Sequence, residues 1–363
     1  MENPLLELQE YENLQEALKK AKGPVQATGT LDSQKVHLMY WLGKDGGFPW
    51  KLVVTYDDQR AREIYDDFRS FTENVWLYPA KDLLFYSADI HGNLMTRQRI
   101  AVWRHLMEEK EGVVVTTLDG LMDHLLPLVF LKQQAVTVEN GQIMDLDEWK
   151  ERLTALGYER TAQVDGMGQF SIRGGIVDIF PLTEEVPVRI ELWDDEVDSI
   201  RSFDPESQRS VEQLEKITIY PSAETILTKK QLEAGIERLE KEEKEYEAAL
   251  RAKHQIEEAS RIRGIIKELT EGIRQGWKRD GLDAYIRYFC PETVSFLDYF
   301  PAGDTLICLD EPARLKEKGE TVEQEFRESM IHRLEKGYLL PGQTELLYAG
   351  TQVLAKLQSS YTV

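Results

Sequence analysis

The sequence predicts an α/β protein built on a parallel sheet, with a mostly antiparallel α+β module inserted into it. Up to about residue 131, short β-branched runs alternate with helical patterns, which is typical of a parallel sheet buried on both faces. From there to residue 222 the chain contains short strand patterns, Gly-containing turns and a single helix. Helical patterns then return, with one more buried strand. We therefore predict three parts, at residues 1–131, 132–222 and 223–363.

Helices and strands alternate along the first part. Leu6, Tyr11, Leu14 and Leu18 have helical spacing, so the first helix is expected over residues 5–21. Further helices are expected at 58–71 and 96–109, and strands at 51–56, 74–78 and 112–117.

The two later parts of the chain differ in their predicted secondary structure. The middle part has one helix pattern, at 146–156, and strand patterns at 135–138, 168–173, 175–180, 186–193 and 217–220. In the third part, Thr228 and Gln231 form a capping box that opens a helical stretch. This stretch runs, with or without a break, to about Trp277, and a buried strand pattern follows at 305–310.

Net charge and the lengths of the apolar runs exclude several classes of protein. In 363 residues, 44 Lys and Arg stand against 65 Asp and Glu, a formal net charge of -21. Such a chain repels the phosphate backbone, which argues against a stand-alone, non-specific nucleic-acid binder. No apolar run approaches the roughly 20 residues of a membrane span, and residues 1–25 lack a secretory signal. We therefore expect a cytoplasmic monomer with no membrane partner.

Two further features bear on the compartment and the extent of the chain. Cys290 and Cys308 are too few for a disulfide framework or a four-cysteine zinc site, so both are expected to be buried in a reducing compartment. Because the sequence stops on β-type residues at 361–363, we expect it to be part of a longer protein.

The phosphate-binding loop that such a unit would use for ATP is incomplete. The pattern G-x-x-x-x-G-K-[ST] cradles phosphates with backbone amides and places a Lys on the terminal ones. Thr28 and Gly29 remain, but Leu31 and Asp32 stand where the second Gly and the Lys are needed. A carboxylate at that position repels a triphosphate, and Lys35 lies too far along the chain to substitute. ATP hydrolysis by this chain is therefore not expected.

Other catalytic motifs are also missing from the sequence. Asp310-Glu311 ends the last buried strand and would hold magnesium in a working ATPase. Without the phosphate-binding loop we favour a structural role, in which these polar residues simply end the buried strand. The sequence contains no G-x-S-x-G, H-E-x-x-H or C-x-x-C, and its six histidines are scattered. We predict no catalytic or metal site.

The middle part carries a candidate interface. On the strand pattern at 186–193 the alternate apolar residues are expected to face the core, which leaves Arg189 and Trp193 facing outward. The same alternation places Arg173 outward, just before the turn residues Gly174-Gly175. Arg and Trp are enriched in interface hot spots, so these residues predict a basic and aromatic binding patch. The alternative is that each Arg pairs with a neighbouring carboxylate and Trp193 folds onto the sheet edge.

The same residues carry a family resemblance. Residues 168–181 (GQFSIRGGIVDIFP) and 188–204 (VRIELWDDEVDSIRSFD) resemble the UvrA-binding domain shared by the excision-repair protein UvrB and the bacterial transcription-repair coupling factors. Residues 297–301 (LDYFP), which lead to Asp310-Glu311, are similar to the segment before the second helicase motif of UvrB. The incomplete phosphate loop favours the coupling factors, and so does the short segment from Tyr78 to Gly92, too short for UvrB's DNA-clamping hairpin.

The resemblance implies a set of site residues. Arg173, Arg189 and Trp193 match the family's UvrA-contacting positions, and we add Phe170, on the same strand as Arg173, to this predicted set. The resemblance also implies a degenerate nucleotide site, a remnant of an ancestral ATPase, made of Thr28, Gly29, Asp32, Asp310 and Glu311.

The resemblance implies an architecture and a function for the chain. It implies a degenerate RecA-like unit in two subdomains, 1–131 and 223–363, with the UvrA-binding domain at 132–222 between them. The chain is then a non-catalytic module that recruits UvrA, without a cofactor of its own. RNA polymerase binding and the ATP- and magnesium-dependent DNA translocase belong to further domains of the family. The alternatives are a UvrB-like ATPase acting on damaged DNA and an autoinhibitory structural module.

Overall fold

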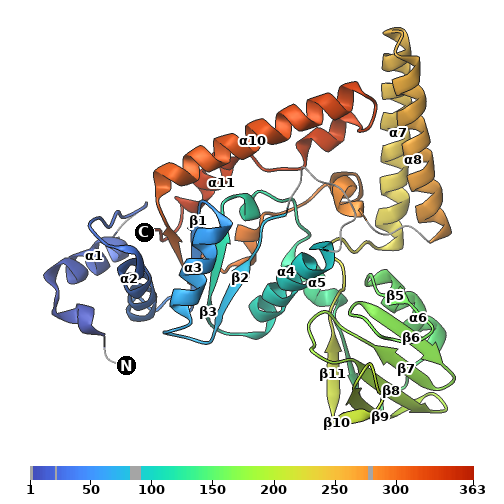
Figure 1. Ribbon diagram of the computed structural model, residues 1–363, viewed down its shortest axis with the longest axis horizontal. Helices are drawn as coiled ribbons and strands as arrows, with labels where there is room; N and C mark the ends of the chain where they lie inside the picture. The colour runs from blue at the N-terminus through green and yellow to red at the C-terminus, as the bar shows by residue number, and fades with distance from the viewer. Residues whose placement is uncertain (1–2, 21–22, 82–90, 277–280) are drawn as a thin grey trace.

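The computed structural model describes residues 3–20, 23–81, 91–276 and 281–363 (Figure 1). For residues 91–93 it describes the backbone alone. Most of the segment from Tyr78 to Gly92 and the predicted helix end at Trp277 lie outside the described residues.

The predicted parallel sheet is confirmed. Its strands are β1 (Trp50–Thr55), β2 (Val75–Tyr78), β3 (Gly112–Thr117) and β12 (Thr305–Leu309), in the order β12-β1-β3-β2 and all parallel. β12 comes nearly 190 residues after β3 in the sequence but pairs directly with β1. The first and third predicted parts of the chain therefore share one sheet.

Helices cover both faces of this sheet, as the β-branched composition of its strands predicts (Figure 1). Val53 and Val115 face one core, to which α1 (Gln9–Lys20), α2 (Asp32–Asp45) and α3 (Asp58–Phe68) contribute. Leu52 and Val114 face the opposite core. That core includes residues of α4 (His91–Glu108), α10 (Pro312–Glu335) and α11 (Gly350–Leu357).

The middle module leaves and rejoins the α/β unit through a two-stranded antiparallel stem. This stem pairs β4 (Val136–Glu139) with β11 (Lys216–Ile219), so the entering and leaving chains run side by side. Between them, α6 (Leu146–Ala155) packs against a six-stranded sheet of order β10-β9-β8-β7-β6-β5. Its strands are β5 (Glu159–Arg160), β6 (Gln169–Arg173), β7 (Ile176–Ile179), β8 (Val188–Trp193), β9 (Glu196–Phe203) and β10 (Ser210–Leu214). Only the β5–β6 pair is parallel, so the predicted mostly antiparallel module is confirmed.

The long helical stretch after Thr228 is broken into a hairpin. α7 (Lys229–Ala252) starts at the predicted capping box and α8 (Ile256–Gln275) returns alongside it (Figure 1). The chain reverses at residues 253–255, where His254 has a φ of 61°. The remaining short helices are α5 (Leu128–Gln134), α9 (Ile286–Phe289), η1 (Pro4–Glu7), η2 (Asp119–Leu121), η3 (Leu282–Tyr285), η4 (Phe296–Tyr299) and η5 (Pro341–Glu345).

Both cysteines are buried and unpaired, as predicted. Among the described helices, none is long and apolar enough to cross a membrane.

Candidate protein-interaction site

The candidate site lies on one face of the six-stranded sheet of the middle module. Asp178 of β7 pairs in register with Arg189 of β8, and Arg189 pairs with Arg201 of β9. Residues directly opposite one another on neighbouring strands project from the same face of a sheet. Three charged side chains therefore form a row across this face, opposite the side on which Val188 and Ile190 enter the core.

Asp178 holds the two predicted arginines together. Its carboxylate is 1% exposed and accepts bonds from Arg189 Nε at 2.6 Å and from Arg173 at 2.8 Å. Arg189 also donates to Gln208 Oε1 at 3.0 Å, and its guanidinium lies 4.5 Å from the ring centre of Phe203. Hydrogen bonding to Asp178 raises the pKa of Arg189, so this cation is fixed in charge and in position.

Trp193 is the most exposed large apolar side chain on the module, at 81%. The two halves of the alternative weighed from the sequence have different outcomes. The arginines do pair with a neighbouring carboxylate, Asp178, but Trp193 does not fold onto the sheet edge. Pairing leaves Arg173 about half exposed, with 48% of its side chain accessible, so it remains available to a partner.

Phe170 does not belong to this face, and its inclusion was wrong. It is 0% exposed and sits in the main core, packed on the opposite side of β6 from the arginines. Alternation on β6 separates Phe170 from Arg173, which are three residues apart and therefore project from opposite faces. Phe170 supports the sheet but cannot touch a partner without unfolding.

A tight turn between β6 and β7 packs closely against β8. Gly174 has a φ of +60°, a left-handed conformation that side chains disfavour. The Gly175 carbonyl accepts a bond from Leu192 N at 2.8 Å, and a Cβ at Gly175 would lie 3.0 Å from Leu192 O. The two glycines therefore allow β8 to approach closely just before Trp193.

Asp178 and Arg201 were not among the predicted site residues. Asp178 lies in the strand pattern at 175–180, and its alternation with Val177 and Ile179 was the available signal. Arg201 pairs with Glu191 and belongs to β9, a strand that the sequence analysis did not identify. The assembled face contains charged, amide and aromatic groups that can bind another protein surface.

The residues of the predicted degenerate nucleotide site are only partly brought together. Thr28 and Gly29 lie exposed in the loop before α2. Asp32 opens α2 with 87% of its side chain exposed, 3.5 Å from Arg60. Asp310 and Glu311 lie at the end of β12, where Glu311 has a φ of 56°.

A salt-bridge cluster, not predicted from the sequence, fills the end of the parallel sheet. Lys35 of α2 donates to Asp310 at 2.8 Å and to Glu311 at 2.6 Å, and Arg60 of α3 donates to Asp310 at 3.1 Å. Burial alone would raise the pKa of Asp310, but the bonds from Lys35 and Arg60 lower it below its usual range. Thr55 of β1 donates a further bond to Asp310, at 3.1 Å. Asp310 therefore has its charge compensated by the protein itself.

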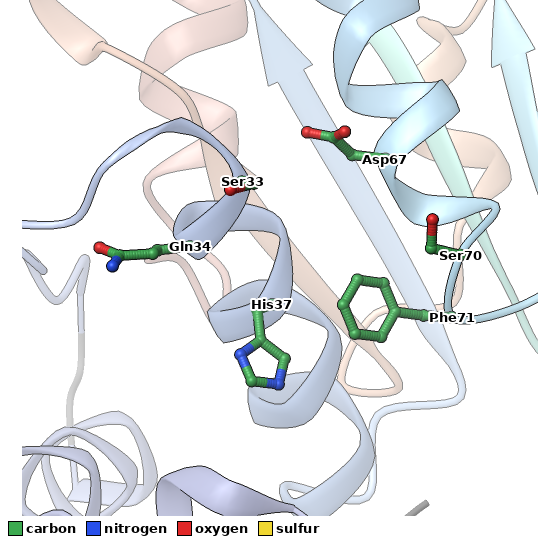
Figure 2. Close-up of a pocket in the computed structure, with 6 residues that line it drawn as sticks. All are labelled: Ser33, Gln34, His37, Asp67, Ser70 and Phe71. Atoms are coloured by element: carbon green, nitrogen blue, oxygen red, sulfur yellow. The ribbon is translucent and has the colours of Figure 1, made fainter.

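A cavity of about 380 Å³ opens beside this cluster, between the start of α2 and the end of α3 (Figure 2). It is lined by Ser33, Gln34, His37, Asp67, Ser70 and Phe71. Figure 2 shows the His37 and Phe71 rings facing each other, with stacked centroids 5.4 Å apart. The six described residues that line it include a carboxylate but no lysine or arginine, so this lining does not suit a triphosphate.

Comparisons with known proteins identify the family of the middle module and relatives of most of the chain. The family described as the UvrB interaction domain matches residues 136–224. The transcription-repair-coupling factor of Bacillus subtilis (strain 168) is 34% identical over 80% of this chain and 24% of its own length. Those of Staphylococcus haemolyticus and Staphylococcus aureus (strain MRSA252) are 30% and 31% identical over 84% of this chain. The chain spans about a quarter of the length of these relatives. The protein thus contains a UvrB interaction domain and belongs, over most of its length, with the bacterial transcription-repair-coupling factors.

Proposed function

We propose that this chain is the UvrA-recruiting part of a transcription-repair-coupling factor and that its middle module binds UvrA through the face of Arg173, Arg189 and Trp193. The observation that carries the proposal is Trp193, 81% exposed on the same sheet face as a preorganised pair of arginines in a UvrB interaction domain. Recruitment of this kind would bring excision repair to an RNA polymerase stalled at DNA damage.

The face has the chemistry of a protein-binding hot spot. A large aromatic side chain can supply buried apolar area, and arginines held in place lose little conformational freedom when a partner binds. Asp178 neutralises only part of the positive charge of Arg173 and Arg189, so the partner surface is expected to offer carboxylates to Arg173. Truncation of a residue of this kind typically costs about 2 kcal/mol or more of binding free energy.

The chain itself is proposed to be non-catalytic. Asp310 is compensated by Lys35 and Arg60 within the protein, and Asp32 occupies the position where a phosphate-binding lysine would stand. Binding of RNA polymerase and DNA, and ATP-driven translocation, are assigned to the larger share of the coupling factor that lies outside this chain.

The test is calorimetric titration of purified UvrA with this chain. We expect micromolar or tighter binding that Arg173→Ala and Trp193→Ala each weaken at least tenfold. Arg160→Ala is the matched control, since Arg160 is an exposed arginine on β5 of the same sheet. A folded wild-type chain that fails to bind UvrA would refute the proposal and favour the structural, autoinhibitory alternative.

The UvrB-like ATPase is tested separately. A ligand at 100 times its dissociation constant stabilises a protein by about 2.7 kcal/mol, which a thermal melt detects. We expect millimolar Mg·ATP to leave the melting temperature unchanged and no phosphate to be released. Stabilisation by Mg·ATP, with hydrolysis that Asp310→Asn abolishes, would instead support the ATPase.

A further inference from the structure

A second exposed apolar side chain lies on the same face as Trp193. Ile143, in the loop between β4 and α6, is 62% exposed. Backbone hydrogen bonds on both sides of Ile143 join this loop to the tip of the β8–β9 hairpin. Gly141 N donates to Val197 O at 2.8 Å, and Met144 N donates to Asp195 O at 2.7 Å. Ile143 is therefore held as an added edge of the sheet.

The register places Ile143 and Trp193 in one row across the strands, with Glu196 between them. Trp193 of β8 pairs with Glu196 of β9, and Glu196 forms an antiparallel bridge with Ile143 on its other side. Directly paired residues project from one face, so these three side chains share the face of Arg189. Two strand spacings separate the outer pair by about 10 Å. The row therefore consists of two apolar side chains with a carboxylate between them.

We infer that Ile143 is a second apolar anchor of the UvrA-binding face and that Glu196 sets the chemistry of the partner between the two anchors. This inference rests on the proposed function. The partner surface would be apolar at two places about 10 Å apart and would present a hydrogen-bond donor or a cation to Glu196 between them. The exposure of Trp193 and Ile143 in the free chain is thereby explained, since neighbouring exposed apolar side chains mark interaction sites.

The location on the sheet distinguishes Ile143 from the other exposed apolar side chains of the module. Val211 is 66% exposed, but it belongs to β10, which pairs with the far end of β9. The seven steps from Glu196 to Phe203 place that end about 23 Å from Trp193. Val211 is thus a matched control: exposed, apolar, on the same sheet and outside the row.

The experiment measures the affinity of the full 363-residue chain for purified UvrA by calorimetry. We expect Ile143→Ala to weaken binding about fivefold to tenfold and Glu196→Lys to weaken it further, while Val211→Ala leaves it unchanged. Because Ile143 is exposed, its truncation should not move the melting temperature, which is recorded for every variant.

Three results would overturn the inference, and they are distinguishable. If Trp193→Ala weakens binding but Ile143→Ala and Glu196→Lys do not, the UvrA face exists and Ile143 is outside it. If the folded wild-type chain does not bind UvrA, both this inference and the proposed function fail. Equal losses for Val211→Ala and Ile143→Ala also contradict it, because the effect would then not be confined to the row.

Discussion

Asp178 holds the arginines of the candidate face in place, although its own side chain is too buried to contact a partner. Its carboxylate is 1% exposed and joins Arg173 and Arg189. A buried carboxylate that keeps two cations in place acts by positioning them, so its removal should affect binding without removing any contact with UvrA.

We therefore expect Asp178→Asn to lower the free energy of unfolding by about 2 kcal/mol and to weaken UvrA binding. The amide can accept one bond from an arginine but cannot compensate two positive charges. Urea denaturation and calorimetry measure the two effects. Asp198→Asn, at an exposed carboxylate on β9, is the control and should change neither. Unaltered binding by a destabilised Asp178→Asn chain would show that the arginines do not need this anchor.

The pairing of Lys35 with Asp310 has a predictable pH dependence. The folded-state pKa of Asp310 is lowered, so its contribution to stability is present above its unfolded pKa of roughly 3.9 and is lost as the pH falls through the folded value. The pKa of Lys35 is raised, so its contribution is lost only as the pH rises above roughly 10.4. Both contributions are present at neutral pH.

Asp310→Asn should therefore be less stable than the wild type at neutral pH, and the difference should shrink as the pH approaches about 3. Urea denaturation as a function of pH measures this difference. Asp304→Asn, at an exposed residue just before β12, should show no such trend. A difference that stays constant over this range would mean that Asp310 gains nothing from its ionised form in the folded chain.

At the scale of elements, sequence patterns predicted strands with an unbroken run or alternation of apolar residues and missed strands without one. β3 matches its expected bounds, because Val113, Val114 and Val115 are all buried. β10 was missed because it is exposed along nearly its whole length, and β9 because charged residues and a register shift interrupt its alternation. Trp193 was identified by alternation alone, whereas Ile143 was not, since only the fold brings its loop beside β9.

Two glycines of the helical hairpin α7–α8 should respond oppositely to alanine. Gly264 of α8 is exposed, and outside its own helix no described residue comes within 4 Å of the place that an alanine Cβ would take, so Gly264→Ala should stabilise the chain by about 0.5–1 kcal/mol. Gly235 of α7 is buried, and its Cβ would lie 2.0 Å from Phe289 Cδ1, so Gly235→Ala should destabilise it by about 1–3 kcal/mol or more. The melting temperatures of both variants, compared with that of the wild type, test this prediction. If both are stabilising, α7 does not pack on Phe289 as closely as described.

At the scale of the whole molecule, a buried charge network joins the first and third parts of the chain, next to the stem of the middle module. Arg99 of α4 is 0% exposed and donates to Asp123 at 2.8 Å and to Glu224 at 3.1 Å, just beyond the stem of the middle module. Lys81 pairs with the same Glu224 and with Asp283, both of which belong to the third part. The first and third parts are thus held together, where the chain leaves the middle module, by the buried charges of Arg99, Asp123 and Glu224.

Arg99→Met should consequently cost about 3–5 kcal/mol, because it leaves two carboxylates buried with only Lys81 as a cation nearby. Arg104→Gln, further along α4, removes bonds to Glu108, Glu184 and the Thr183 carbonyl, and because the three side chains in its ion pairs are about one-third exposed it should cost less, about 1 kcal/mol. Urea denaturation of both variants measures the contrast. Equal small costs for both variants would place the coupling between the parts in the apolar core that they share and not in this network.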